Sequence, residues 1–106
     1  LAQALGGRYG LPHGAMNALC LPPALEFNRT LAPQEVDRFG DAIGGDAVAK
    51  TRELALLGGF HDLRQFGVPR EELRDVAAAA AERAGNLANP RPASVDEIVA
   101  ILEGIW

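Results

Sequence analysis

Side chains able to do chemistry are few in this 106-residue chain, which has two histidines and one cysteine. His13 stands in the segment LPHGAMNALC, where Pro12 is expected to open a helix. The positive end of the helix dipole would disfavour the imidazolium form of His13, and a neutral imidazole is the form that binds a divalent metal. The simpler alternative is a core or surface histidine with one hydrogen bond. His13 by itself therefore indicates no definite site.

The other candidate sites are better explained by local structure. His61 and Asp62 are adjacent, so their side chains would diverge on a helix, and the glycines before them predict an exposed loop. Cys20 lies in an apolar run without a basic neighbour, which indicates a core thiol rather than a reactive one. The glycines of LGGRYG lack the G-x-G-x-x-G order, so they predict turns or close backbone contacts.

Composition and charge exclude several classes of protein. With 48% hydrophobic and 23% charged residues, the chain is typical of a globular domain. A net charge of -4 without a basic cluster argues against a nucleic-acid surface, and no apolar run is long enough to cross a membrane. A lone cysteine fits a reducing cytoplasm. Because the chain begins at Leu1 and its only methionine is Met16, we expect it to be a fragment of a longer protein.

These residues must be positioned by helices, which proline, glycine and capping residues mark along the chain. A buried helix is expected over 12–20, with a break or kink at Pro22-Pro23 and a continuation to Asn28, because each proline ring clashes with the carbonyl four residues earlier. This segment lacks a polar stripe, which predicts a position at the centre of the domain.

Two more helices are expected in the middle of the chain, one from Pro33 to the glycines at 44–45 and one capped by Asp46 that ends at the glycines at 58–59. The apolar side chains at helical spacing on these two helices are Val36, Phe39, Ile43, Val48, Leu54 and Leu57.

The last third of the chain predicts two further helices. Pro69 is expected to open one that runs to Gly85, in which the alanines at 77–81 form a thin face for close packing. Ser94 and Glu97 form a capping box for the final helix, whose apolar residues recur at helical spacing. No alternating strand or internal repeat is present, so we predict a single all-α domain of five to six helices over residues 1–106.

Several segments, taken together, carry a resemblance to a known family. They are LPHG at 11–14, the pairs Asn17-Ala18, Leu21-Pro22 and Phe27-Asn28, the segment LRQFGVPREEL at 63–73, and NPRPASVDEIVAILEGIW at 89–106. With these segments in this order, the sequence resembles the iron-containing alcohol dehydrogenase family, which includes the maleylacetate reductases. The resemblance covers nearly the whole chain.

The resemblance implies a fold and a cofactor set. Members have an N-terminal α/β domain that binds NAD(P) and a C-terminal all-helical domain, the two-domain arrangement of dehydroquinate synthase-like proteins. A divalent metal, iron or zinc, lies between the domains and is held by one aspartate and three histidines, the last of which corresponds to His13. The other ligands and the nucleotide-binding domain are expected before Leu1, so this fragment alone is expected to bind no nucleotide and to be inactive.

One departure concerns proton transfer. Many metal-dependent members have a further histidine, implicated in moving the substrate proton, where this chain has Gln3. Because glutamine does not titrate, the proton would instead move through water or the cofactor ribose. LGGRYGLPH and Trp106 favour the maleylacetate reductase branch, whereas Gly14 and Asn17 favour the other branch, so the substrate stays open.

The resemblance implies that the full-length protein is an NAD(P)-dependent oxidoreductase. It would transfer hydride between nicotinamide and an alcohol, a carbonyl or a maleylacetate-like substrate, with His13 as metal ligand or, in metal-independent relatives, as a hydrogen-bond donor to the substrate oxygen. The expected partners are its own nucleotide-binding domain, a small-molecule substrate and a second copy in a cytoplasmic homodimer, with no nucleic acid or membrane. The alternative is a non-catalytic helical interaction module.

Overall fold

Helices joined by short turns make up the whole chain, and the computed structural model describes all of residues 1–106. The α-helices are α1 (Ala2–Tyr9), α2 (His13–Arg29), α3 (Pro33–Ile43), α4 (Ala47–Leu57), α5 (Leu73–Ala81), α6 (Ala84–Leu87) and α7 (Val95–Glu103), and the short 3-10 helices are η1 (Arg64–Phe66) and η2 (Arg70–Glu72). The all-α prediction is confirmed. The helices exceed the predicted five to six because α1 and the one-turn α6 were not expected.

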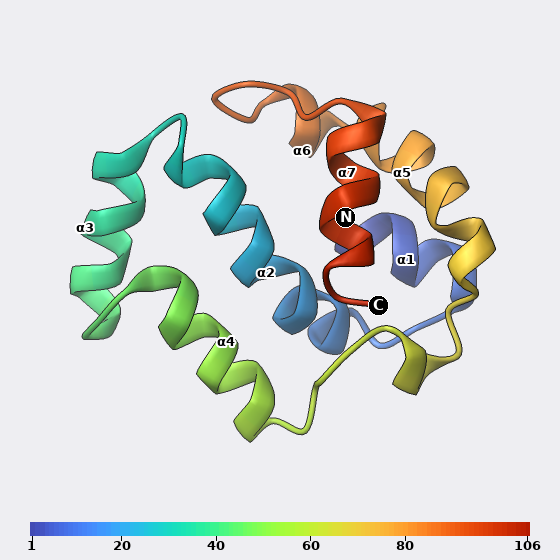
Figure 1. The fold of residues 1–106 in the computed structure, drawn as a ribbon, viewed down its shortest axis with the longest axis horizontal. Coiled ribbons are helices and arrows are strands. Elements are labelled where there is room, and N and C mark those ends of the chain that lie inside the picture. Colours follow the sequence, from blue (N-terminus) through green and yellow to red (C-terminus); the bar gives the residue numbers. More distant parts are fainter.

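Helix α2 is the centre of the domain, as its lack of a polar stripe predicted. It packs against α3 and α4 on one side and against α1 and α7 on the other (Figure 1). Ala15, Met16, Leu19 and Cys20 are buried along it. Packing on two sides accounts for the apolar character of these buried positions, whereas Asn17 and Leu21 on the same helix are exposed.

Helix α2 runs unbroken through Pro22-Pro23 to Arg29, so the predicted continuation to Asn28 is confirmed and the alternative of a break is wrong. Each proline removes one N–H donor from the helix ladder. The turns on both sides are nevertheless held by packing, since Leu19 and Pro22 are buried and Phe27 packs against the main core. Tertiary packing supplies most of the stability of a helix in a protein, and here it outweighs the lost hydrogen bonds.

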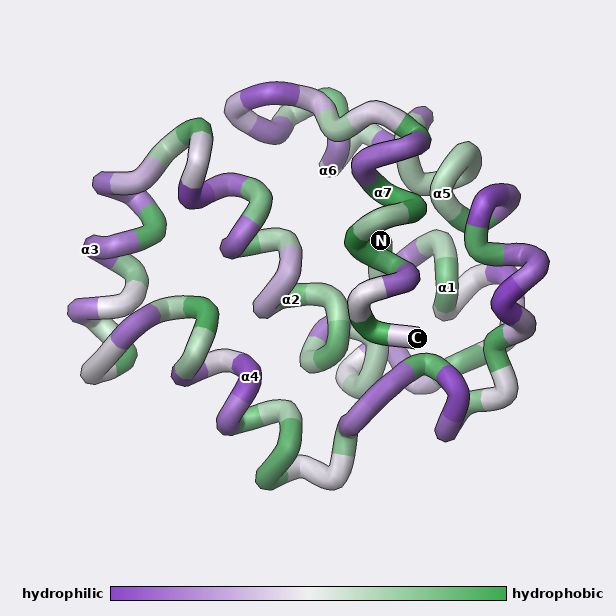
Figure 2. Tube along the Cα trace, viewed as in Figure 1, coloured by the Kyte–Doolittle hydropathy of each residue, from purple (hydrophilic) through white to green (hydrophobic).

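The main hydrophobic core lies among α1, α2, α5 and α7 and includes residues of the loop between α4 and α5. Hydrophobic residues recur along α7, whereas α3 on the opposite side of the domain is mostly hydrophilic (Figure 2). The largest fully buried side chains are Leu5, Met16, Leu63, Leu73, Leu102 and Val76.

Helices α3 and α4 form a hairpin that packs on the other side of α2. Pro33 begins α3, and the Asp46 carboxylate caps α4 by accepting a 2.8 Å hydrogen bond from the Ala49 amide, as predicted. Gly40 is needed in this hairpin, because a Cβ at that position would lie 2.5 Å from the Gly45 carbonyl oxygen.

The apolar side chains at helical spacing on this hairpin are only partly buried. Val36 and Val48 are buried, but Phe39, Leu54 and Leu57 are exposed. The hairpin packs mainly on α2, which leaves part of each helical stripe uncovered. Figure 2 shows the resulting hydrophobic stretch at the C-terminal end of α4.

The helix predicted from Pro69 to Gly85 is divided into three segments. It begins as η2, continues as α5 to Ala81, and resumes after a turn as the short α6. Within α5, Ala77 and Ala80 are buried, which confirms the thin face for close packing against the neighbouring α7. The Asn86 amide donates to the Ala81 carbonyl at 3.0 Å, a side-chain contact that closes the turn where the predicted helix would have continued.

The capping box at the start of α7 is confirmed. Ser94 accepts from the Glu97 amide at 3.3 Å, and the Glu97 carboxylate accepts from the Ser94 amide at 2.8 Å. Of the apolar stripe of α7, Ile98 and Leu102 are buried, whereas Ile101 and Ile105 are half-buried.

Candidate functional site

The candidate site lies at the turn between α1 and α2. Helix α1, which leads into this turn, was not predicted from the glycine-rich sequence. Helix α1 buries Ala2, Ala4 and Leu5. It ends at Gly10, whose left-handed backbone (φ 65°) favours glycine and reverses the chain, as expected for a turn glycine. A Cβ at Gly6 would lie 3.4 Å from the Leu11 carbonyl oxygen, so the returning chain passes close to α1.

His13 is the first residue of α2 and is exposed. Pro12 flanks the helix with φ −58° and ψ 123° rather than opening it, so His13 lies one position nearer the helix start than predicted. Ala15 and Met16, one turn further along, are buried. The first turn of α2 is therefore anchored in the core while its leading imidazole lies at the surface.

The residues of this chain form no complete metal site. No group of three or more His, Cys, Asp or Glu side chains lies close enough together to hold a metal ion. A protein zinc site uses at least three protein ligands, so a metal held by His13 would need further ligands from outside these residues.

The remaining candidates from the sequence are His61, Asp62 and Cys20. His61 is exposed in a loop, and Asp62 accepts from the Arg64 guanidinium at 3.0 Å and from the Gln65 amide at 3.0 Å. Cys20 is buried, and burial raises the pKa of its thiol to about 11. Both observations agree with the local-structure explanations, a surface loop and a core thiol.

Comparison with known proteins identifies the family. The family model described as "Fe-containing alcohol dehydrogenase family, C-terminal" matches residues 1–106. The chain belongs to this family.

Curated relatives agree with that assignment. The chain is 35% identical over 104 residues to a maleylacetate reductase of Sphingobium indicum, covering 96% of this chain and 29% of that protein. It is 27% identical over 119 residues to a lactaldehyde reductase of Escherichia coli K12, covering all of this chain and 31% of that protein. The chain thus spans less than a third of the length of these relatives, which their names describe as reductases.

Solved structures share the fold. A crystal structure of a 1,3-propanediol oxidoreductase matches with a TM-score of 0.92 and 27% identity, covering 99% of this chain and 31% of that one. An alcohol dehydrogenase from Oenococcus oeni matches with a TM-score of 0.91 and 25% identity. The predicted fold class and the predicted resemblance are both confirmed. No helix of this domain is both long enough and apolar enough to span a bilayer.

The family implies a metal and a nicotinamide cofactor in the full-length enzyme. The exposed imidazole of His13 is compatible with the contribution of one ligand to such a metal site. An imidazole exposed at a helix start is a suitable ligand for iron or zinc. Gln3, at the position where many members have a further histidine, is exposed on α1 and does not titrate.

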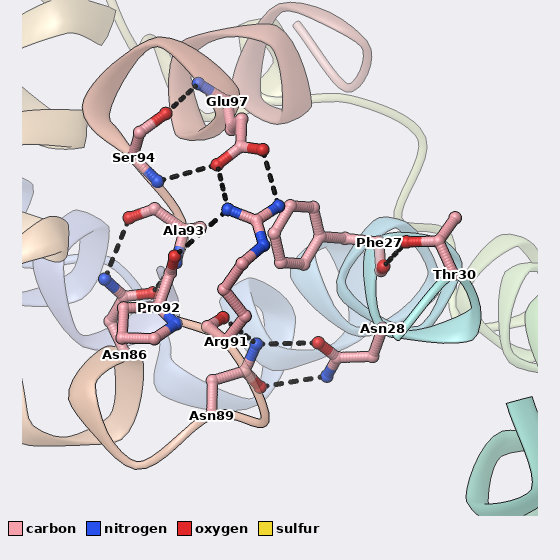
Figure 3. Close-up of polar contacts among 10 residues, drawn as sticks. All are labelled: Phe27, Asn28, Thr30, Asn86, Asn89, Arg91, Pro92, Ala93, Ser94 and Glu97. Atoms are coloured by element: carbon pink, nitrogen blue, oxygen red, sulfur yellow. Dashed lines mark hydrogen bonds and ion pairs between the residues drawn. The ribbon is translucent and has the colours of Figure 1, made fainter. Parts of the chain in front are cut away.

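A polar network that sequence reasoning did not foresee explains the NPR element of the family resemblance (Figure 3). Asn28 and Asn89 exchange two amide hydrogen bonds, at 3.0 and 2.7 Å. The Arg91 guanidinium donates to both carboxylate oxygens of Glu97, at 3.0 and 2.7 Å, and lies over the Phe27 ring. This network joins the C-terminal end of α2 to the start of α7, at the end of α2 opposite His13.

Proposed function

We propose that this chain is the C-terminal helical domain of an NAD(P)-dependent oxidoreductase. The enzyme would transfer hydride between nicotinamide and an alcohol, a carbonyl or a maleylacetate-like substrate. Support comes from the family match over the whole chain and from relatives named as reductases and oxidoreductases. The observation that carries the proposal is the exposed imidazole of His13, in the LPHG motif, at the start of the central helix.

The domain would supply one part of a composite site. Its relatives are more than three times as long, which leaves room for a nucleotide-binding domain that completes the ligand set and holds the cofactor. The substrate would be a small molecule bound between the two domains, and the full-length enzyme a cytoplasmic homodimer in which Cys20 stays reduced. In this arrangement His13 and its surrounding turn face the partner domain.

His13 would act by coordination, with its ring held by the anchored first turn of α2. A divalent iron or zinc ion supplies the Lewis acidity that polarises a substrate oxygen for hydride transfer. Gln3 has no titratable proton, so the substrate proton would pass to water or to the cofactor ribose. The alternative role for His13, in an enzyme that works without metal, is a hydrogen bond to the substrate oxygen.

The test compares two histidine variants in the complete protein. His13→Ala should lose most bound metal and most NAD(P)H-dependent turnover, because one of the ligands is removed. His61→Ala is the matched control, since it removes the other exposed histidine of the chain and should leave both measurements unchanged. Metal content is measured by mass spectrometry and turnover by nicotinamide absorbance.

Two outcomes separate the possible roles of His13. Loss of turnover with unchanged metal content would favour the hydrogen-bonding role over ligation. Unchanged metal content together with an unchanged rate would overturn the proposal and leave the helical interaction module as the remaining function.

A further inference from the structure

A cleft of about 370 Å³ lies between α2, α4 and the C-terminal end of α7 (Figure 1). Its volume falls within the range of pockets that bind small molecules, about 300–1,000 Å³. Apolar side chains from α2, α4, the loop after α4 and the end of the chain form much of its wall: Leu19, Pro22, Pro23, Leu56, Phe60 and Ile105. The cleft thus offers a hydrocarbon-lined space that the fold itself leaves unfilled.

The walls of this cleft are held by contacts within the protein. Leu19 is buried on α2, and Ala55 is buried on α4. The Phe60 amide donates to the Ala55 carbonyl at 2.9 Å, and the Leu63 amide donates to the Ile105 carbonyl at 2.8 Å. The loop that carries Phe60 is thereby fastened both to α4 and to the end of the chain. The cleft is therefore preformed, as small-molecule pockets usually are.

Arg52 is the charged side chain on the lining of this cleft, and it forms no ion pair within the chain. It also lines an adjoining cleft, whose two carboxylates belong to Glu26 and Glu97. Glu26 pairs with Arg29 at 3.8 Å. Glu97 pairs with Arg91 at 2.7 Å. The exposed guanidinium of Arg52 is therefore left free beside an apolar space.

The surroundings of Arg52 favour a ligand with a single negative charge. A guanidinium presents its N–H donors as a planar fork, which matches the two oxygens of a carboxylate. Glu26 and Glu97 add negative charge to the adjoining cleft, and this charge disfavours a dianion such as a phosphate monoester. The apolar walls, which include the Phe60 ring, suit a hydrocarbon body rather than a sugar.

We propose that this cleft binds a monocarboxylic acid with a compact apolar body. The carboxylate accepts hydrogen bonds from Arg52, and the hydrocarbon part lies against Leu19, Phe60 and Ile105. Loss of hydrogen bonds to a charged group weakens binding by about 10- to 100-fold, so Arg52 is the residue on which the affinity should depend most. The inference does not depend on the role of His13, which does not line the cleft.

The test titrates the complete protein with 3-phenylpropionate and measures the dissociation constant by ligand-observed NMR. The alcohol 3-phenylpropanol is the matched probe, since it has the same hydrocarbon body without the carboxylate. The wild-type protein should bind the acid at least about 10-fold more tightly than the alcohol, because only the acid pairs with Arg52. Phenyl phosphate, which carries a second negative charge, should bind more weakly than the acid.

Two pairs of variants locate the binding site on the protein. Arg52→Met should weaken the binding of 3-phenylpropionate by about 10-fold or more, whereas Arg38→Met removes an exposed arginine of the same hairpin outside the cleft and should leave it unchanged. Leu56→Ser removes part of the apolar wall and should weaken the binding of both the acid and the alcohol. Leu57→Ser is its matched control, because Leu57 is the more exposed neighbour and does not line the cleft. Thermal unfolding of each variant shows that the fold is kept.

Several results would overturn the proposal. It is wrong if the acid does not bind at millimolar concentrations, if the alcohol binds as tightly as the acid, or if Arg52→Met leaves the affinity for the acid unchanged. Tighter binding of phenyl phosphate than of 3-phenylpropionate would show that a monocarboxylate is the wrong class. Equal losses in Leu56→Ser and Leu57→Ser would place the ligand outside the cleft. None of these results bears on the metal content of His13→Ala, by which the proposed function is tested.

Discussion

Replacement of Asn28 by alanine tests whether the reciprocal amide pair fastens α2 to the loop before α7. Asn28 donates to Asn89 at 3.0 Å and accepts from it at 2.7 Å. Asn89 also donates to the Arg91 carbonyl at 3.0 Å, so it keeps one partner when Asn28 is removed. The perturbation therefore removes two hydrogen bonds and leaves one amide oxygen without its protein donor.

The expected loss follows from these contacts. Each hydrogen bond contributes about 0.5–1.5 kcal/mol net, so two contribute about 2 kcal/mol. Alanine is the better helix former by roughly 0.5 kcal/mol, which offsets part of the loss. Asn28→Ala should thus lower the free energy of unfolding by about 1.5 kcal/mol.

Urea unfolding followed by far-ultraviolet circular dichroism measures this loss. Asn17→Ala is the matched control, because Asn17 lies on the same helix and is exposed, so its replacement reports helix propensity alone. It should be neutral or stabilising by up to about 0.5 kcal/mol. The double variant Asn28→Ala/Asn89→Ala should lose little more than Asn28→Ala, because both changes remove the same pair.

Two results would refute the reasoning about this pair. One is that Asn28→Ala proves no less stable than Asn17→Ala. The other is that the losses of Asn28→Ala and Asn89→Ala add fully in the double variant, which would mean that the two side chains act independently.

Two further predictions concern pH and thiol reactivity. Hydrogen bonds from Arg91 and the Ser94 backbone lower the pKa of Glu97 from 4.5 to about 2, so its stabilisation is present above pH 4.5 and lost as the pH falls towards 2. The urea midpoint should therefore fall less steeply over this range in Glu97→Gln than in the wild type, and coincident curves would contradict this. Because burial raises the pKa of Cys20 to about 11, its thiol should react with a disulfide reagent near neutral pH only after denaturation. Stoichiometric labelling of the folded protein would count against that.

Signals that lie within a few residues predicted the local elements well. The Ser94–Glu97 capping box and the Asp46 cap form as expected, because each depends on atoms within one helical turn. Whether α2 breaks or stays continuous at Pro22-Pro23 was not predictable in this way, because packing on both sides of the helix decides it.

The same difference between local signals and long-range contacts applies to the candidate site. His13 was found from its motif, and its exposed place at the start of α2 agrees with a ligand role that stays a prediction. The contacts of Glu72 with Arg8 and Tyr9 were not found, because nothing in the sequence relates these residues.

By itself, then, the sequence determined the all-helical class, the starts of α3, α4 and α7, and the family to which the chain belongs. These depend on local backbone chemistry and on a motif read in order along the chain. Only the tertiary structure decided which apolar stripes are buried, where α5 ends, and that η2 contacts the end of α1. Those features arise from contacts between segments far apart in sequence, whose pairing depends on the folding of the whole domain.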